Sequence, residues 1–492
     1  MNSDIITKIS CAELIFFGFK DDFLIKVLNY LNKSFSVFIF SWKHKNFYKT
    51  NQDYYDMFNL AKPYNLNKII IEISKEEILK NKFLTSEFNE CREYFDKMLN
   101  RVFIKKMSKE DSNLYFYNLL FFWHFIFSNN IKTKLITFDS TPHFPWDIVA
   151  FFVAKKFGIK ILILKRTLIS NRIVFSNDFR EGYSNLIKNA SNQKDKKKII
   201  NGRASSYWDK YSKDLIQSRI QNSKMDFIVL KKINQFLKNY FINIINLNRS
   251  YYNLNYLEYT YFVIVHLCKK LILRRLWKKN SIKKFNSSKK IIYFPLHFQP
   301  ERSTDPEASK YSDQFHSIEI LSKFIPDDWE IWVKEHPRQI PIEYPNIKRY
   351  HYRNKQDYLK LIKLKNVKLL NFDFSSEMGI SKCEVVASCT GSILWEGLIK
   401  NKTAIRFGST WHDDCKSCFY IDEVLKNKKF FSDQFNKKHT QIENNVNEFI
   451  DHLSDYSIFS SNSSLFVKKS NIEENILVNN FTSFIKSYIN KN

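Results

Sequence analysis

Residues 134–164 read KLITFDSTPHFPWDIVAFFVAKKFGIKILIL and decide the fold class. An apolar run at 134–138 ends in a polar loop, a helical stretch follows at 146–157, and after Gly158 a second apolar run begins at 160. A strand, a helix, a glycine and a strand at this spacing predict a βαβ unit of a parallel sheet. An all-helical protein is the alternative, and it leaves the short β-branched runs unexplained.

The same alternation extends to both sides of this stretch. In the first part of the chain we expect strands at 14–18, 35–40 and 68–73, and a buried helix at 114–127. After residue 289 the predicted strands are 290–294, 329–334, 367–370, 383–388 and 403–407, and the predicted helices are 312–324, 356–363, 375–381 and 392–400. This order predicts a second doubly wound α/β domain.

The residues between the two domains differ in composition. They are polar and basic and lack strand and turn signals, so we expect helices. Residues 265–279 alternate apolar and basic pairs at helical spacing, with no acid among them. One interpretation is a basic amphipathic helix on an anionic membrane surface. The other is a solvated helix that packs its apolar face on the core.

The predicted fold class is therefore α/β, with two Rossmann-like doubly wound domains and a basic helical insertion between them. The expected parts are an N-terminal α/β domain at 1–185, the basic helical segment at 186–288, a C-terminal α/β domain at 289–440 and a helical tail at 441–492.

Composition excludes several classes of protein. The 492 residues are 44% hydrophobic, which is too apolar for a disordered chain, and 8 Gly and 10 Pro exclude collagen-like and Pro-rich sequences. Lys and Arg exceed Asp and Glu by 28. Cys415 and Cys418 have metal-like spacing but no second pair, so no metal site is expected. The start lacks a signal-peptide pattern, and a cytoplasmic location is expected.

Polar residues follow three consecutive predicted strands of the second domain. Gln299 and Glu301 follow the first, Lys334 and His336 follow the second, and a turn of sequence SCTGS at 388–392 follows the third. Because ligands in open parallel sheets lie beyond the carboxyl ends of the strands, we expect this set to bind a phosphate that carries a sugar. The candidate donor-binding residues are Gln299, Lys334, His336, Ser388, Thr390, Gly391, Ser392 and Glu396.

The turn at 388–392 opens a predicted helix. Backbone N–H groups and the positive helix end attract an anion there, and Gly391 lets the backbone approach closely. The simpler interpretation is an N-cap, because Ser392 and Glu396 also suit a helix start. Lys334 and His336 could neutralise a departing phosphate.

Several nucleotide-binding motifs are missing from the sequence. It contains no GxGxxG, no GxxxxGK[ST] and no DxD. We therefore expect no bound cofactor and no metal clamp on the donor, so that lysine, histidine and a helix N-terminus have to stabilise the leaving phosphate.

The runs 293–301 (YFPLHFQPE), 312–314 (SDQ), 333–337 (VKEHP) and 390–392 (TGS) together resemble the bacterial capsule polysaccharide biosynthesis family, which includes Kdo transferases acting on lipid-linked acceptors. Residues 407–412 (FGSTWH) are also similar to that family. The two-domain layout and the His-Pro motif are similar to bacterial sialyltransferases of the GT-B fold.

The resemblance implies a GT-B glycosyltransferase whose C-terminal domain binds a nucleotide-activated sugar, with CMP-Kdo as the leading donor. By motif position, Lys334 and His336 face the phosphate, residues 388–392 hold its oxygens, and Glu396 lies near the ribose. Gln299 and Glu301 lie at the cleft. We expect a lipid-linked or polysaccharide acceptor. The basic segment would then dock a cytoplasmic enzyme peripherally on the inner face of the cytoplasmic membrane, where lipid-linked acceptors lie.

An oxocarbenium-like reacting centre calls for a carboxylate near the anomeric carbon. Asp139 follows the predicted strand at 135–138 and is our candidate base or nucleophile, with Glu301 as the competing carboxylate. A loop or N-cap role is the plainer interpretation of Asp139.

Two further functions stay open. A CDP-glycerol-type polyol-phosphate transferase would need a second histidine as base, and His143 is available. A nucleic-acid-binding protein would explain the charge, but the basic residues are spread widely and no RRM, KH or zinc-finger pattern occurs, so no nucleic acid is expected as a partner.

Overall fold

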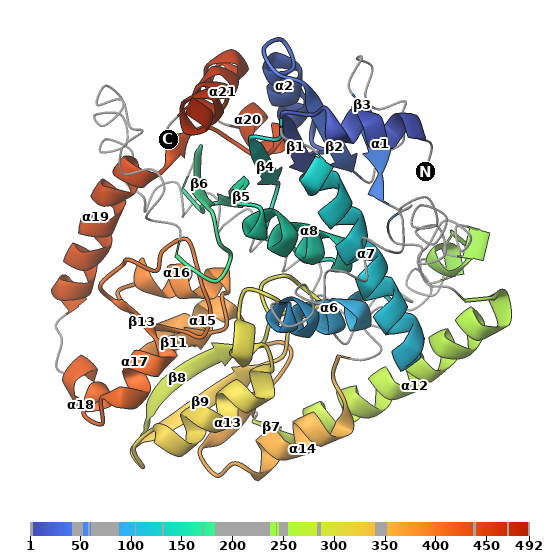
Figure 1. Cartoon of the computed structure of the whole chain (residues 1–492). Helices are drawn as coiled ribbons and strands as arrows, with labels where there is room; N and C mark the ends of the chain where they lie inside the picture. The colour runs from blue at the N-terminus through green and yellow to red at the C-terminus, as the bar shows by residue number, and fades with distance from the viewer. Residues whose placement is uncertain are drawn as a thin grey trace. The chain divides into compact units, whose positions relative to one another are not determined.

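The computed structural model describes residues 3–41, 53–57, 60, 88–103, 105–129, 132–169, 171–182, 237–242, 244–245, 254–282, 287–339, 352–435, 439–469 and 472–490. The strand expected at 68–73 lies outside these residues. The chain forms two compact units (Figure 1). The first comprises Met1–Val102, Lys106–Asn201 and Leu453–Asn492, and the second comprises Phe103–Lys105 and Gly202–His452.

The first unit is built on a sheet with the strand order β14-β6-β5-β4-β1-β2-β3. These strands are β1 Leu14–Phe17, β2 Val37–Ser41, β3 Asp53–Asp56, β4 Leu135–Phe138, β5 Lys160–Arg166, β6 Arg172–Ser176 and β14 Ile458–Phe459. Strands β3, β2, β1, β4 and β5 are parallel to one another. Strand β6 is antiparallel to both of its neighbours, β5 and β14. The inner strands β1 and β4 are buried along their whole length, as expected of parallel strands covered on both faces.

Helices flank this sheet. They are α1 Ser3–Ser10, α2 Asp22–Leu31, α6 Asn89–Val102, α7 Lys109–Asn129, α8 Pro145–Lys156, α20 Ser464–Lys469 and α21 Glu474–Asn490. Helix α8 connects β4 to β5, which confirms the βαβ unit read from the sequence. It starts at Pro145, a position where a missing N–H leaves no helical hydrogen bond unmade. The helix expected at 114–127 is confirmed as part of α7, with Trp123 fully buried.

The C-terminal residues complete the first unit. Strand β14 pairs with β6, and α21 packs on α2 with Phe481 and Ile485 buried. The N–H of Ser464 donates to Oδ1 of Asp21 at 2.6 Å, the same carboxylate that caps α2. The segment from 453 onward, which the sequence placed in a tail of its own, is therefore part of the first unit's core.

The second unit is built on a sheet with the strand order β13-β12-β11-β8-β9-β10-β7. The strands are β7 Ser281–Ile282, β8 Lys290–Pro295, β9 Trp329–Lys334, β10 Val367–Leu370, β11 Val385–Ser388, β12 Thr403–Arg406 and β13 Cys418–Tyr420. All neighbouring strands are parallel. Numbered along the chain from β8, the strand order is 3-2-1-4-5-6, the doubly wound arrangement. Among its described strands the first sheet has the same order from β1 to β6.

The helices of the second unit include the basic segment. They are α12 Tyr256–Asn280, α13 Gln314–Phe324, α14 Lys355–Lys363, α15 Ser376–Lys382, α16 Ser392–Leu398, α17 Ile421–Lys426, α18 Phe430–Phe435 and α19 His439–Tyr456, with the 3-10 turn η5 Ser309–Tyr311. The indole of Trp277 is fully buried in the core and donates to the carbonyl of Leu370 at 2.8 Å. Helix α12 and the short strand β7 after it therefore belong to the second α/β unit.

Among the described helices, none has both the length and the apolar composition needed to cross a bilayer.

Candidate functional site

The second sheet reverses its strand order between β8 and β11. From β8, the chain builds outward through β9 and β10 on one side and through β11, β12 and β13 on the other. At such a reversal the crevice beyond the carboxyl ends of the strands is the usual ligand site. The three strand ends singled out in the sequence belong to β11, β8 and β9, which are consecutive neighbours about 4.8 Å apart.

His297, two residues beyond β8, bridges the reversal. Its Nε2 atom lies 2.9 Å from the Ser388 hydroxyl and accepts the N–H of Thr390 at 3.3 Å. Because an N–H can only donate, the ring proton is on Nδ1, which lies 3.2 Å from the Ser303 hydroxyl. The pKa of His297 is lowered to about 4, chiefly by burial; the charge of Glu307 acts to raise it and that of Arg353 to lower it. A neutral imidazole therefore joins the β8 and β11 ends at neutral pH.

In the turn after β11, the hydroxyls of Ser388 and Thr390 form hydrogen bonds within the protein. Besides the Ser388 contact with His297, Oγ1 of Thr390 donates to the carbonyl of Ser303 at 2.6 Å. Gly391 is the N-cap of α16 without a side-chain cap, and a Cβ there would lie 2.8 Å from the Ser388 hydroxyl. What the turn presents to solvent is the backbone around Gly391, together with Ser392, whose hydroxyl donates to Oε1 of Glu396 at 3.0 Å. Polar backbone and a carboxylate thus line the open side.

Gly408, after β12, closes the turn from the other side. A Cβ at this position would lie 2.4 Å from the carbonyl of Glu307 and 2.7 Å from Cγ2 of Thr390. Its N–H donates to the carbonyl of Cys389 at 2.9 Å. Phe407 and Gly408 therefore hold the turn at 388–392, the candidate phosphate-binding turn, against the loop after β8.

Arg353 is buried and forms hydrogen bonds with the residues that follow β8 and β9. Its guanidinium donates from Nε to Oε2 of Glu335 at 2.8 Å and from Nη2 to the carbonyl of His297 at 2.9 Å, and it also binds Oε1 of Gln299. The hydroxyl of Tyr358 binds the same Glu335 carboxylate. This buried network ties the loop after β8 to the end of β9.

The other sequence candidates divide into supporting and accessible positions. Gln299 is 7% exposed, and its side-chain amide faces inward, accepting from Arg353 and donating to the Thr304 hydroxyl. Its backbone N–H and carbonyl pair with the side-chain amide of Gln339. Glu301 is exposed. Lys334 is buried at the end of β9. His336 is half-buried, accepts the N–H of Arg338 on Nδ1 at 3.1 Å, and has its ring 5.3 Å from that of Phe298.

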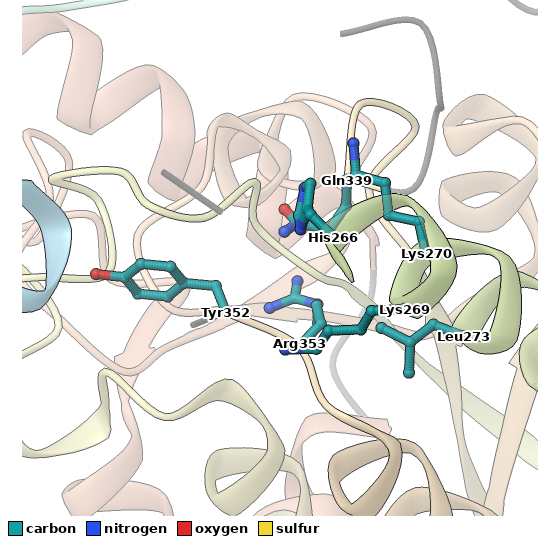
Figure 2. A pocket seen from close by; sticks show the side chains of 7 residues that line it. All are labelled: His266, Lys269, Lys270, Leu273, Gln339, Tyr352 and Arg353. Carbon is teal, nitrogen blue, oxygen red and sulfur yellow. The ribbon is translucent and has the colours of Figure 1, made fainter. Parts of the chain in front are cut away.

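A shallow pocket lies beside this network, with about 280 Å³ of empty space when open solvent is included. It is lined by His266, Lys269, Lys270, Leu273, Gln339, Tyr352 and Arg353. Figure 2 shows the Arg353 guanidinium turned toward His266 and Gln339, with Tyr352 directed the other way. The lining contains no carboxylate, so a basic wall adjoins the network that supports the strand ends.

The first sheet reverses its order between β1 and β4, and Asp139 lies at that reversal. The N–H of Asp139 donates to the carbonyl of Phe17 at 3.0 Å, and its Oδ1 accepts the Ser140 hydroxyl at 3.0 Å. Gly18, directly after β1, has φ +80°, and a Cβ there would lie 2.5 Å from the Asp139 carboxyl carbon. A glycine at 18 is therefore required for the carboxylate to occupy the strand end.

Two groups on the loop after Asp139 are placed for proton chemistry. Nδ1 of His143 lies 2.7 Å from the carbonyl of Thr141, so Nδ1 carries the proton and Nε2 is the basic nitrogen. Asp147 is buried, and burial raises its pKa well above the ordinary value, with the Asp139 charge as the next cause. Backbone N–H groups of His143 and Phe144 act in the opposite direction. Burial and the nearby Asp139 carboxylate therefore both favour the protonated form of Asp147.

Sequence reasoning missed His297, Arg353 and Asp147 as site residues. His297 lies within the run 293–301 that carries the family resemblance, so the sequence did point to it. The phosphate-facing role was given instead to His336, the histidine of the His-Pro pair. Arg353 gave no signal, because its partner Glu335 is 18 residues away along the chain.

Metal-binding geometry is not found among the described residues: no group of three or more His, Cys, Asp or Glu side chains is close enough to hold an ion. Cys415 and Cys418 are both buried, and burial raises the pKa of the Cys415 thiol to about 11.

No family model matches the chain, and no curated protein matches it. Among solved structures, KpsC from Thermosulfurimonas dismutans, a beta Kdo 2,7 transferase, is 9% identical, covers 77% of this chain and 91% of its own, and has a TM-score of 0.30. UDP-GlcNAc 2-epimerase from Methanocaldococcus jannaschii is 12% identical, with 87% and 93% covered and a TM-score of 0.22. The wall teichoic acid polymerase TagF is 10% identical, with 99% and 90% covered and a TM-score of 0.19.

Similarities this low carry no argument about the present chain. Its fold class, two doubly wound α/β units, rests on its own strand order.

Proposed function

We propose that the chain is a GT-B-type glycosyltransferase that moves a sugar from a nucleotide-activated donor to a lipid-linked or polysaccharide acceptor of surface polysaccharide biosynthesis. CMP-Kdo is the leading donor, from the motif resemblance, and the inner face of the cytoplasmic membrane is the proposed location. The supporting observation is that both sheets reverse their strand order at a polar strand end, with His297 and Thr390 at one reversal and Asp139 at the other.

In this proposal the second unit binds the donor. The backbone at Gly391 and Ser392 receives the phosphate oxygens, and Glu396 takes a ribose hydroxyl. Lys334 and His336, at the adjacent end of β9, neutralise the nucleotide as it leaves. His297 is neutral and buried, so its role is to hold the turn in place through Ser388 and Thr390.

The first unit supplies the carboxylate of the reaction. Asp139 acts as base or nucleophile at the anomeric carbon, because it lies at a strand-order reversal. Burial and the Asp139 charge raise the pKa of the neighbouring Asp147. Glu301 is the competing carboxylate. It is exposed and accepts the Ser303 hydroxyl at 3.3 Å.

One observation favours a second candidate function. The Nε2 atom of His143 is the basic nitrogen of its ring and lies on the loop that begins at Asp139. A polyol-phosphate transferase using CDP-glycerol needs a histidine base at such a position. Hydrolysis assays with CMP-Kdo and with CDP-glycerol distinguish the two functions, because only the true donor releases its nucleotide at a rate that His143→Gln or Asp139→Asn lowers.

Calorimetry with CMP, CDP, UDP and GDP tests the donor assignment. We expect CMP to bind best and His336→Ala to weaken it at least tenfold, the loss of about 1.4 kcal/mol that one charge-assisted hydrogen bond supplies. His316→Ala is the matched control, because His316 is an exposed histidine on α13 of the same unit. Equal affinity for all four nucleotides, or equal effects of the two substitutions, would contradict the proposal.

A further inference from the structure

Exposed hydrophobic side chains gather on one part of the second unit. Ten of the seventeen large hydrophobic residues that are exposed among the described residues lie on α12 and on the helical residues 237–242 and 244–245. These ten are Leu237, Phe241, Ile242, Ile245, Tyr256, Leu257, Tyr261, Ile264, Leu271 and Ile272. We call them the apolar ridge. Scattered single residues of this kind are normal on a protein surface, whereas a continuous patch marks an interaction site.

Helical spacing explains why the ridge is continuous. Leu257, Tyr261, Ile264, Cys268 and Leu271 recur every three or four residues, so they form one stripe along α12. With a rise of 1.5 Å per residue, the helix extends over about 37 Å, and Figure 1 shows it as a long, straight element.

The opposite stripe of α12 holds the helix on the protein. It carries Val263, His266, Lys270, Leu273 and Trp277, all buried. An ordinary amphipathic helix would bury Ile264 and Ile272 and expose the lysine, and this helix does the reverse. His266 and Lys270 line the pocket beside the Arg353 network, whereas Ile264 and Ile272 face solvent.

Residues 237–242 and 244–245 widen the ridge at the N-terminal end of α12. Tyr240 and Ile244 pack against Tyr259 and Val263 of α12, which leaves Phe241 and Ile245 pointing outward. The hydroxyl of Tyr240 lies 2.7 Å from that of Thr260, so the two helical stretches are joined by a polar contact as well. The ridge is therefore two helices wide at this end.

Charge on the same two stretches is almost all positive. They contain Lys238, Lys269, Lys270, Arg274, Arg275, Lys278 and Lys279, against one acid. That acid, Glu258, pairs with Lys105 at 3.1 Å. Arg275, Lys278 and Lys279 are exposed at the C-terminal end of the ridge.

We propose that the apolar ridge and the basic end of α12 dock the protein on an anionic lipid bilayer, with α12 lying in the plane of the interface. Aliphatic side chains enter the acyl boundary, tyrosines stay at the level of the headgroups, and the basic end pairs with anionic headgroups. The inference stands on surface geometry and charge, and it does not require the proposed transferase activity.

Cys268 provides a direct test, because it is exposed on α12 between the ridge residues Ile264 and Leu271. Cys11 and Cys268 are the two exposed thiols of the chain, and the other five are buried. In Cys11→Ser protein, an environment-sensitive fluorophore on Cys268 reports the polarity of the ridge. We expect a blue shift when vesicles of phosphatidylcholine and phosphatidylglycerol are added, and a much smaller one with phosphatidylcholine alone. An unchanged spectrum with both vesicles would overturn the proposal.

Cosedimentation of unlabelled protein with the same vesicles separates the two contributions. Leu257→Gln with Ile264→Gln should weaken binding about tenfold per residue, whereas Leu114→Gln with Ile476→Gln, exposed outside the ridge, should leave it unchanged. Replacing Arg275, Lys278 and Lys279 by Gln should weaken binding about 100-fold. Replacing the exposed Lys426, Lys428 and Lys429 is the charge-matched control.

Two outcomes contradict the docking surface. If all four sets weaken binding equally, the net charge of the chain and not the ridge binds vesicles. If the ridge substitutions leave vesicle binding unchanged but convert a dimer to a monomer in light scattering, the occupant is a second copy of the chain. Both measurements use protein without donor, so failure of the proposed transferase function would not affect them.

Discussion

Replacing Arg353 tests the network that supports the strand ends of the second sheet. Its guanidinium makes four hydrogen bonds: two to Glu335, one to the carbonyl of His297 and one to Gln299. The two charged side chains are 2% and 0% exposed. Arg353→Met leaves the Glu335 carboxylate buried with Tyr358 as its remaining hydrogen-bond donor from a side chain, so we expect a loss of about 3–5 kcal/mol in the free energy of unfolding.

Urea unfolding followed by circular dichroism measures this loss, and the midpoint of thermal unfolding should fall by roughly 6–20 °C for a unit of this size. The double variant Arg353→Met with Glu335→Met removes both charges, and we expect it to recover at least about 2 kcal/mol relative to the sum of the single changes. Arg338→Met is the matched control, because Arg338 is an exposed arginine on the loop after β9. A cost below about 1 kcal/mol for Arg353→Met, or additivity in the double variant, would refute the reasoning.

Three further predictions concern single residues. The pKa of His297 is about 4, below the ordinary 6.5, so the folded protein favours the neutral ring. Its contribution to the free energy of unfolding should be fully present above pH 6.5 and be lost, by up to roughly 3 kcal/mol, as the pH falls through 4. The urea midpoints at pH 7.5 and pH 5 should therefore differ less in His297→Gln than in the unchanged protein. Gly18→Ala places a Cβ against Asp139 and should cost more stability than Gly158→Ala, where φ is also positive but no atom lies within 4 Å; equal losses would count against the close contact. Because burial and Asp139 raise the pKa of Asp147, stability should fall as the pH rises above 4, and Asp147→Asn should stabilise the protein more at pH 8 than at pH 4 in thermal unfolding.

The strands that sequence patterning predicted well are the buried parallel ones. The run 135–138 (LITF) is buried at every residue, because both faces of this parallel strand are covered, and the structure has a strand there. The run 367–370 (VKLL) is also a strand, with Lys368 as its one exposed residue. Strand β6 was missed since its sequence, RIVFS at 172–176, follows β5 after a short turn and pairs antiparallel to it. A pattern of βαβ units predicts parallel strands joined by helices, so it does not predict an antiparallel strand that follows β5 directly.

The candidate site was predictable only where residues follow a strand directly. The ends of β8, β9 and β11 were found because the chain order of a doubly wound sheet brings them together. The inward orientation of Gln299 depends on Arg353, and the outward orientation of Ile264 depends on what the other side of α12 contacts. Both orientations depend on contacts with residues far away in the sequence, so the spacing of residues along one helix or strand does not predict them.

The return of the chain to its first unit has a consequence for synthesis in the cell. Residues up to 182 leave the ribosome early, but β14 and α21, which complete the edge and the helical cover of that sheet, come from 458 onward. At about 5–20 residues per second, the incomplete N-terminal half waits roughly 15–60 s for its last helix. During that interval the surface of α2 that α21 later covers is open to chaperones, so vectorial synthesis favours completion of the second unit before the first.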